Sequence, residues 1–180
     1  LSHIAIIYNL LGQFGQAEKI LKQALSIQKE MLGHEHPSVA NSLNILANNY
    51  LFQAKYSKAE ELLKRALFIN KKAFGKKHID ISVNLNDLGL YYFHEAQYSK
   101  AETHFKRALE INREIFGSDH LYIAININNI ALVAAAQGDY TQAAKLQNQA
   151  LVIWEKNFAI ESTHKSTLLH NLAIYRSEEH

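Results

Sequence analysis

The chain repeats itself with a fixed period of 42 residues, and this repetition limits its fold more than any other feature of the sequence. The stretch Tyr56–Glu60 reads Tyr-Ser-Lys-Ala-Glu, and the same five residues return at Tyr98–Glu102. Shortly after each copy, Lys64–Leu67 and Lys106–Leu109 are also identical. A fixed period of this size is typical of solenoids, in which each repeat packs on its neighbours. We therefore expect an array of stacked repeats.

Each repeat has the pattern of two helices joined by a short turn. The first is predicted over residues 37–52, where apolar residues fall on one helical face at Leu43, Leu46, Ala47 and Tyr50. The second is predicted over residues 57–74. We expect Ser57 to cap its start through its hydroxyl group and Gly75 to end it in a left-handed conformation.

Small residues recur where the two helices of a pair should meet. Ala47 and Ala59 hold these places in one repeat, and the later repeats carry Gly89 with Ala101 and Ala131 with Ala143. Without large side chains at the contact, the two axes can approach to the short end of the usual range of about 8–10 Å.

The period sets the expected organisation of the chain. It divides the sequence into a partial repeat (1–36), three repeats (37–78, 79–120 and 121–162) and a final partial repeat (163–180). We expect one repeat array over all 180 residues. Leu1 aligns with Leu43, and neither end carries a polar capping helix, so the array is interpreted as a fragment of a longer chain.

Composition excludes several classes of protein. The formal net charge is +2, which gives no basis for binding nucleic acid. No stretch approaches the roughly 18 uninterrupted apolar residues of a membrane span. The absence of cysteine excludes a disulfide framework and fits a reducing compartment. The sequence therefore predicts a cytoplasmic protein that does not enter a membrane.

No pattern in the sequence predicts catalysis, a cofactor or a metal site. Glycine-rich phosphate loops and the common hydrolase and metalloprotease motifs are missing. His34 and His36 lie two residues apart, but a zinc site needs three or four converging ligands. Because His36 recurs at His78 and His120, we interpret it as a residue that helps to start the first helix.

These residues resemble the tetratricopeptide repeat (TPR) family. The family pattern is matched by Leu46-Ala47, Tyr50, Ala54, Tyr56, Ala59 and Ala66-Leu67. The usual period is 34 residues, whereas a period of 42 is similar to the subtype of kinesin light chains and many bacterial multi-repeat proteins. The resemblance implies an all-α, right-handed superhelical solenoid of antiparallel helix pairs, whose first helices line a concave groove that holds peptides. One repeat departs from the pattern, with Ala134 in place of the helix aromatic and Gln147 in place of an apolar residue.

A recurring polar position on the first helices is the strongest candidate for binding. It carries Asn44, Asn86 and Asn128, with His170 as the fourth member. The resemblance implies that it faces the groove, where amides could pair with a peptide backbone. In the alternative, the asparagines tie neighbouring helices inside the array. With apolar positions near them, the predicted partner-binding residues are Asn44, Asn48, Asn86, Leu90, Phe93, Asn128, Leu132 and His170.

The predicted function is a scaffold-like protein-interaction module that binds a peptide segment of a partner in the concave groove. The partner is a protein or peptide, and neither nucleic acid nor a membrane is expected. The alternative is a regulatory or self-assembly segment of a larger signalling protein, which would self-associate through its uncapped ends.

Overall fold

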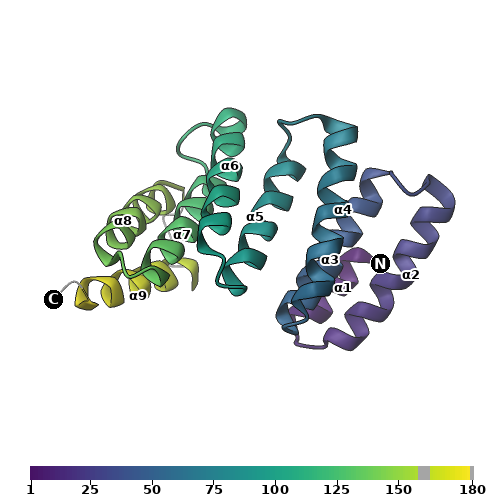
Figure 1. Cartoon of the computed structure of the whole chain (residues 1–180), viewed down its shortest axis with the longest axis horizontal. Helices are drawn as coiled ribbons and strands as arrows, with labels where there is room; N and C mark the ends of the chain where they lie inside the picture. Colours follow the sequence, from purple (N-terminus) through teal and green to yellow (C-terminus); the bar gives the residue numbers. More distant parts are fainter. Residues whose placement is uncertain (158–162, 179–180) are drawn as a thin grey trace. The chain divides into compact units, whose positions relative to one another are not determined.

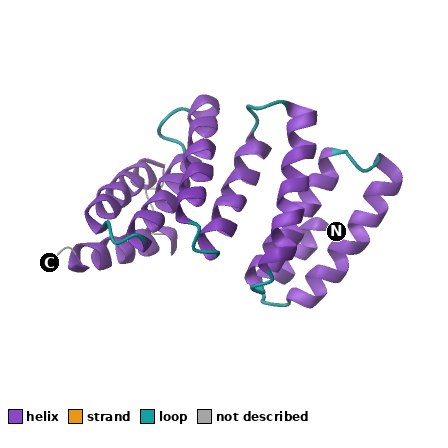
Figure 2. Ribbon diagram, in the orientation of Figure 1, coloured by secondary structure: helices purple, strands orange, loops and turns teal. Residues whose placement is uncertain are grey.

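The computed structural model describes residues 1–157 and 163–178, and within this part the chain is helical, without strands (Figures 1 and 2). The predicted boundary after residue 162 lies outside the described residues. The helices are α1 (Ser2–Leu10), α2 (Phe14–Leu32), α3 (Pro37–Phe52), α4 (Tyr56–Phe74), α5 (Ile79–His94), α6 (Tyr98–Phe116), α7 (Leu121–Ala136), α8 (Tyr140–Asn157) and α9 (Thr163–Glu178).

The chain forms two compact units, residues 1–91 (unit 1) and 92–180 (unit 2), with the boundary inside α5. In unit 1, α1 packs on α2, α2 on α3 and α3 on α4. In unit 2, α6 packs on α7, α7 on α8 and α8 on α9. The packing of consecutive helices in pairs confirms the predicted all-α, TPR-like fold. The predicted first helix over residues 37–52 coincides with α3.

A histidine precedes each of three first helices, and its ring caps the helix. In each case Nδ1 accepts a hydrogen bond from the backbone N–H two residues later, which would otherwise lack a partner at the helix start. The distances for His36, His78 and His120 are 3.1, 3.3 and 3.2 Å. The rings of His78 and His120 also stack on a preceding phenylalanine, with centroids 4.1 and 4.3 Å apart. The interpretation of His36 as a helix-starting residue is confirmed.

The prediction that Ser57 caps the second helix is wrong. Helix α4 begins one residue earlier, at Tyr56, and Lys55 holds the N-cap position without a side-chain hydrogen bond. Ser57 therefore lies inside the first turn. At the start of α8, the cap acceptor is Asp139, whose Oδ1 accepts from the backbone N–H of Gln142 at 3.0 Å.

Glycine ends three of the second helices. Gly33, Gly75 and Gly117 have φ angles of 85°, 78° and 77°, as the expected left-handed cap requires. Their ψ angles of 163°, −149° and −172° are extended, however, so the backbone enters a region that is essentially open to glycine alone. A residue with a β-carbon would be strained at these positions.

The turn between the helices of a pair also needs a positive φ, and here the repeats differ. Gly12 and Gly138 adopt φ angles of 72° and 83°, whereas Ala54 and Ala96 adopt 55°. An alanine in this region is disfavoured by roughly 1–2 kcal/mol because its Cβ approaches the following carbonyl oxygen. Two of the four turns are therefore strained.

Ala54→Gly is expected to raise the free energy of unfolding by about 0.5–1 kcal/mol, because relief of the strain exceeds the entropy cost of a glycine. Urea denaturation measures the change. Gly138→Ala is the reverse substitution and should destabilise the protein. A β-carbon at Gly138 would meet no atom within 4 Å, so this loss would come from the backbone alone. If both variants were as stable as the wild type, the backbone of Ala54 would not be strained.

The small residues predicted at the helix contacts are fully buried. Ala47 and Ala59 are 0 % exposed in unit 1, on α3 and α4, and Ala131 and Ala143 are 0 % exposed in unit 2, on α7 and α8. A larger side chain at these points would have to push two packed helices apart.

Ala59→Leu is therefore expected to lower the free energy of unfolding by about 1–3 kcal/mol through overpacking. Chemical denaturation measures this loss. Ala73→Leu is the matched control, because Ala73 is exposed on the same helix, and it should change stability little. The placement of Ala59 between α3 and α4 would be refuted by equal effects of the two substitutions.

Candidate functional site

Unit 1 contains a groove of about 470 Å³ formed by side chains of α1, α3 and α5, which we call the unit 1 groove. All three are first helices of their repeats. The groove combines apolar and amide side chains with one carboxylate. Its lining includes Ile6 and Leu10 from α1, Asn41, Asn44, Asn48 and Phe52 from α3, and Val83 and Asp87 from α5.

The carboxylate of Asp87 is the centre of an amide cluster at the base of the groove. Asp87 is 6 % exposed, and its Oδ2 accepts hydrogen bonds from Nδ2 of Asn44 and, at 3.2 Å, from Nδ2 of Asn48. Burial raises the pKa of Asp87 from its ordinary value of 3.8 to about 6. Hydrogen bonds from Asn44, Asn48 and Asn86 act in the opposite direction but are outweighed. Asp87 is therefore mostly ionised at neutral pH.

A chain of buried amides continues from this cluster into the interior. Asn84 Nδ2 donates to Asn44 Oδ1 at 2.7 Å, and Asn70 Nδ2 donates to Asn84 Oδ1 at 2.7 Å. The chain ties α3, α5 and α4 together. Unit 2 contains an equivalent pair, in which Asn112 Nδ2 donates to Asn126 Oδ1 at 2.7 Å.

Sequence reasoning missed these paired amides, although a signal was present. Asn70 and Asn112 lie 42 residues apart, as do Asn84 and Asn126. Each pair also spans 14 residues, from the end of a second helix to the following first helix. An asparagine that recurs on both helices of a junction indicates a polar contact between repeats.

The asparagine row that the sequence predicted as a binding surface has internal partners. Asn44 donates to Asp87 and accepts from Asn84, and Asn128 Oδ1 accepts from Gln147 Nε2 at 3.2 Å. These bonds support the alternative in which the asparagines tie neighbouring helices. Asn44 also lines the unit 1 groove. Direct contact of this row with a partner stays a prediction.

The other predicted site residues lie in different surroundings. In unit 1, Asn48 and Asn86 join Asn44 around Asp87, and Leu90 is half-buried. The members in unit 2 include Leu132, which is half-buried, and His170, which is exposed on α9. Phe93, also in unit 2, is half-buried, with its ring centroid 5.9 Å from that of His94 and 5.7 Å from that of Tyr98.

A further exposed row on the first helices was also missed. Its members recur at the 42-residue period and are Asn41, Val83, Ile125 and Thr167. The first two line the unit 1 groove. The last two line a separate cavity of about 210 Å³ in unit 2, together with Asn128. The residue types at this position differ from repeat to repeat, so the sequence carried no recurring signal for this row.

Paired helices, with a groove formed by the first member of each pair, define a helical repeat protein. The tetratricopeptide repeat family matches residues 1–72, 80–156 and 122–180, and the chain therefore belongs to this family. The predicted resemblance is confirmed. Arrays of this family are generally protein-interaction modules and typically non-catalytic.

Several solved structures have the same fold. BtubC (BKLC) from P. vanneervenii is 21% identical, with a TM-score of 0.82 over 97% of this chain and 70% of that chain. A protein of Podosopora anserina described as a kinesin light chain with nearly identical TPR-like repeats is 25% identical, with a TM-score of 0.79 over 99% of this chain and 84% of its own. The apo form of RapI is 21% identical, with a TM-score of 0.74 over 99% and 68% of the two chains. No curated protein matches the chain.

Two further properties concern the described residues. None of their helices is both long and apolar enough to cross a membrane. Nor do three or more of their histidine, aspartate and glutamate side chains gather in a way that could hold a metal ion.

Proposed function

We propose that this chain is a protein-interaction module and that the unit 1 groove binds a peptide segment of a partner protein. The observation that carries the proposal is the groove itself, which three first helices line with apolar and amide side chains. Such a surface provides pockets for side chains and polar groups for a peptide backbone.

The lining of the groove indicates the chemistry of this peptide. Phe52 is 67 % exposed, and Ile6, Leu10 and Val83 are exposed large apolar residues of the same groove. Exposed apolar patches of this kind usually mark binding sites. Asp87 places a negative charge at the base of the groove. We therefore expect a peptide that carries one lysine or arginine between apolar side chains.

A displayed peptide library selected on the full chain tests this function. Peptides with one cationic residue flanked by apolar residues should be enriched, and their affinity can be measured by fluorescence anisotropy. Phe52→Ala should weaken binding about tenfold or more, because aromatic anchors dominate such sites. Asp87→Asn should reduce the preference for lysine or arginine over a neutral residue. The fold of both variants is checked by circular dichroism.

The matched control changes Lys64 and Arg65 to alanine on α4. Both are exposed, outside the groove, and should leave affinity nearly unchanged. If this control weakens binding while Phe52→Ala does not, the peptide binds elsewhere and the groove proposal fails. If no peptide is enriched and the chain self-associates with rising concentration in sedimentation experiments, the alternative of a self-assembly segment is favoured.

A further inference from the structure

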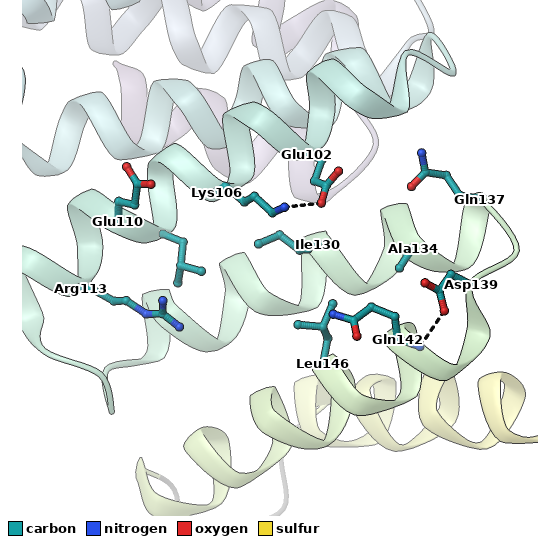
Figure 3. A pocket seen from close by; sticks show the side chains of 11 residues that line it. Glu102, Lys106, Glu110, Arg113, Ile130, Ala134, Gln137, Asp139, Gln142 and Leu146 are labelled. Atoms are coloured by element: carbon teal, nitrogen blue, oxygen red, sulfur yellow. Dashed lines mark hydrogen bonds and ion pairs between the residues drawn. The ribbon is translucent and has the colours of Figure 1, made fainter.

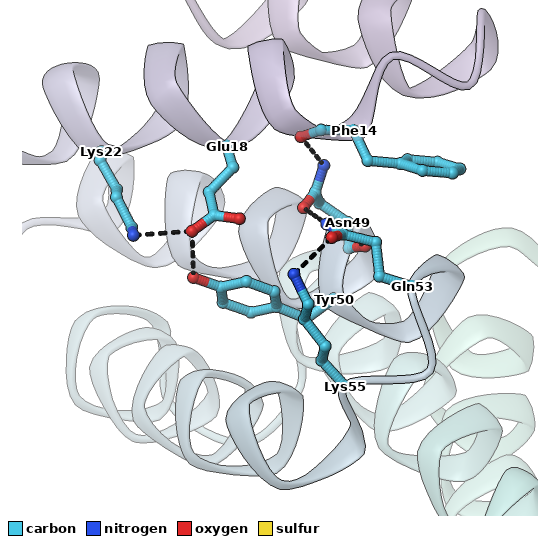
Figure 4. Close-up of polar contacts among 7 residues, drawn as sticks. All are labelled: Phe14, Glu18, Lys22, Asn49, Tyr50, Gln53 and Lys55. Atoms are coloured by element: carbon cyan, nitrogen blue, oxygen red, sulfur yellow. Dashed lines mark hydrogen bonds and ion pairs between the residues drawn. The ribbon is translucent and has the colours of Figure 1, made fainter.

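A buried tyrosine in unit 1 provides a template for a second site in unit 2. Tyr50 of α3 is 5 % exposed, and its hydroxyl group donates to Glu18 Oε1 of α2 at 3.0 Å (Figure 4). Glu18 also pairs with Lys22 at 2.7 Å. The Nζ atoms of Lys55 and Lys58 lie 5.9 and 5.6 Å from the centre of the ring. These four side chains therefore surround the ring and its hydroxyl group.

Two repeats later, half of these surroundings recur without the tyrosine. Ala134 of α7 holds the place of Tyr50. The carboxylate and ammonium groups persist as Glu102 and Lys106 of α6, which pair at 2.6 Å (Figure 3). Asp139 and Gln142 hold the places of the two lysines beside the ring. The partner for a phenol hydroxyl is thus retained, whereas the phenol is not.

A cavity lies where the tyrosine side chain is missing. It has a volume of about 390 Å³, and we call it the Ala134 cavity. All four equivalents of the side chains around Tyr50 line it, and its apolar walls come from Leu109, Ile130 and Leu146. Figure 3 shows Ile130 and Leu146 around this space. For comparison, a cavity of about 150 Å³ is large enough to bind benzene in another protein.

We infer that the Ala134 cavity binds a phenol group, namely the tyrosine side chain of a partner protein. The ring would pack on Leu109 and Ile130, and the hydroxyl group would donate to the carboxylate of Glu102, as Tyr50 does to Glu18. A hydrogen bond to an ionised acceptor is stronger than one between neutral groups, so the carboxylate favours tyrosine over phenylalanine. The site lies wholly within unit 2 and does not depend on the peptide proposed for the unit 1 groove.

The test compares two probes that differ only in the hydroxyl group, N-acetyl-tyrosinamide and N-acetyl-phenylalaninamide. Each is titrated into the ¹⁵N-labelled full chain, and amide chemical shifts are recorded by NMR. We expect saturable shifts around Glu102, Lys106 and Ala134, and an affinity for the tyrosine probe that is about ten- to a hundredfold higher. The absence of shifts around these residues, or equal affinity for both probes, would overturn the inference.

Two variants locate the site. Ala134→Tyr supplies the missing ring within the chain, so it should abolish probe binding and raise the melting temperature. Ala136→Tyr is its control, because Ala136 is exposed on the same helix, and it should bind the probe normally. Glu102→Gln should remove most of the preference for the tyrosine probe. Unchanged binding by Ala134→Tyr refutes the site, and if that variant does not fold, an unchanged preference in Glu102→Gln refutes it instead.

Discussion

Asp87→Asn should raise the free energy of unfolding by up to about 3 kcal/mol at pH 8, since the pKa of Asp87 is raised by about two units and each unit corresponds to about 1.4 kcal/mol. The cause is burial of the ionised carboxylate at the base of the unit 1 groove. Asparagine already holds the same position of the repeat at Asn129, which is also buried. The substitution should therefore fit, with its carbonyl oxygen accepting the bonds from Asn44 and Asn48.

The stability that Asp87→Asn adds should increase as the pH rises. The pKa of Asp87 is 3.8 in the unfolded chain and about 6 in the folded one, so the folded state binds more protons between these values. The wild type therefore loses stability as pH rises from about 4 to 6. Below about pH 3 the carboxyl group is mostly protonated in both states, and there the variant should have no advantage from this source. Urea denaturation of both proteins from pH 4 to 8 measures the difference, and a difference that does not grow with pH would contradict the burial argument.

Asn84→Ala should have the largest destabilising effect, because it breaks the buried amide chain at its centre. Asn70 Nδ2 and Asn44 Oδ1 would each lose the partner that Asn84 supplies. A buried polar group left unpaired costs about 1–3 kcal/mol, so the free energy of unfolding should fall by about 2–6 kcal/mol. Asn41→Ala is the control, because Asn41 is exposed on α3, and it should change stability by less than about 0.5 kcal/mol.

A double-mutant cycle separates the hydrogen bond from simple loss of packing. Asn70→Ala combined with Asn84→Ala removes both partners of the bond, and the loss should be smaller than the sum of the two single losses. At the last junction between repeats, where α8 packs on α9, Trp154 and Leu168 hold the places of Asn70 and Asn84. This junction therefore accepts an apolar pair. Strict additivity of the two substitutions, measured by urea denaturation, would show that Asn70 and Asn84 do not depend on each other.

Most of the fold could be predicted because its determinants are local and repeat along the chain. The apolar period of Leu43, Leu46 and Tyr50 fixes one face of α3, and recurrence alone identified His36 as a helix-starting residue. The start of α4 was misplaced by one residue because Ser57 is a good cap by type. The backbone nevertheless begins the helix at Tyr56, and residue type alone does not reveal that register.

The site was harder to predict because it depends on contacts between repeats. The sequence located Asn44 and Asn128 on the first helices. The helical pattern predicts the direction of their side chains, but not which side chain of a neighbouring helix forms a hydrogen bond with them. Asn44 is contacted from α5 by Asn84 and Asp87, residues about one full period away. Asp87 gave no recurring signal, because the same position carries Ile45 and Asn129 in the adjacent repeats. The pKa of Asp87 is raised because the side chain is buried, and the burial of a single carboxylate cannot be inferred from the composition of the chain.

The paired amides also affect how reliably the repeats assemble during folding. Similar repeats risk docking in the wrong order, and such misassembly is a characteristic failure of repeat proteins. If Asn112 faced Leu168 instead of Asn126, its buried amide would lose the partner it has in the native junction. That mismatch would cost about 1–3 kcal/mol. The amide pairs at the two inner junctions and the apolar pair at the last one thus disfavour this wrong neighbour, even where the helices themselves would fit.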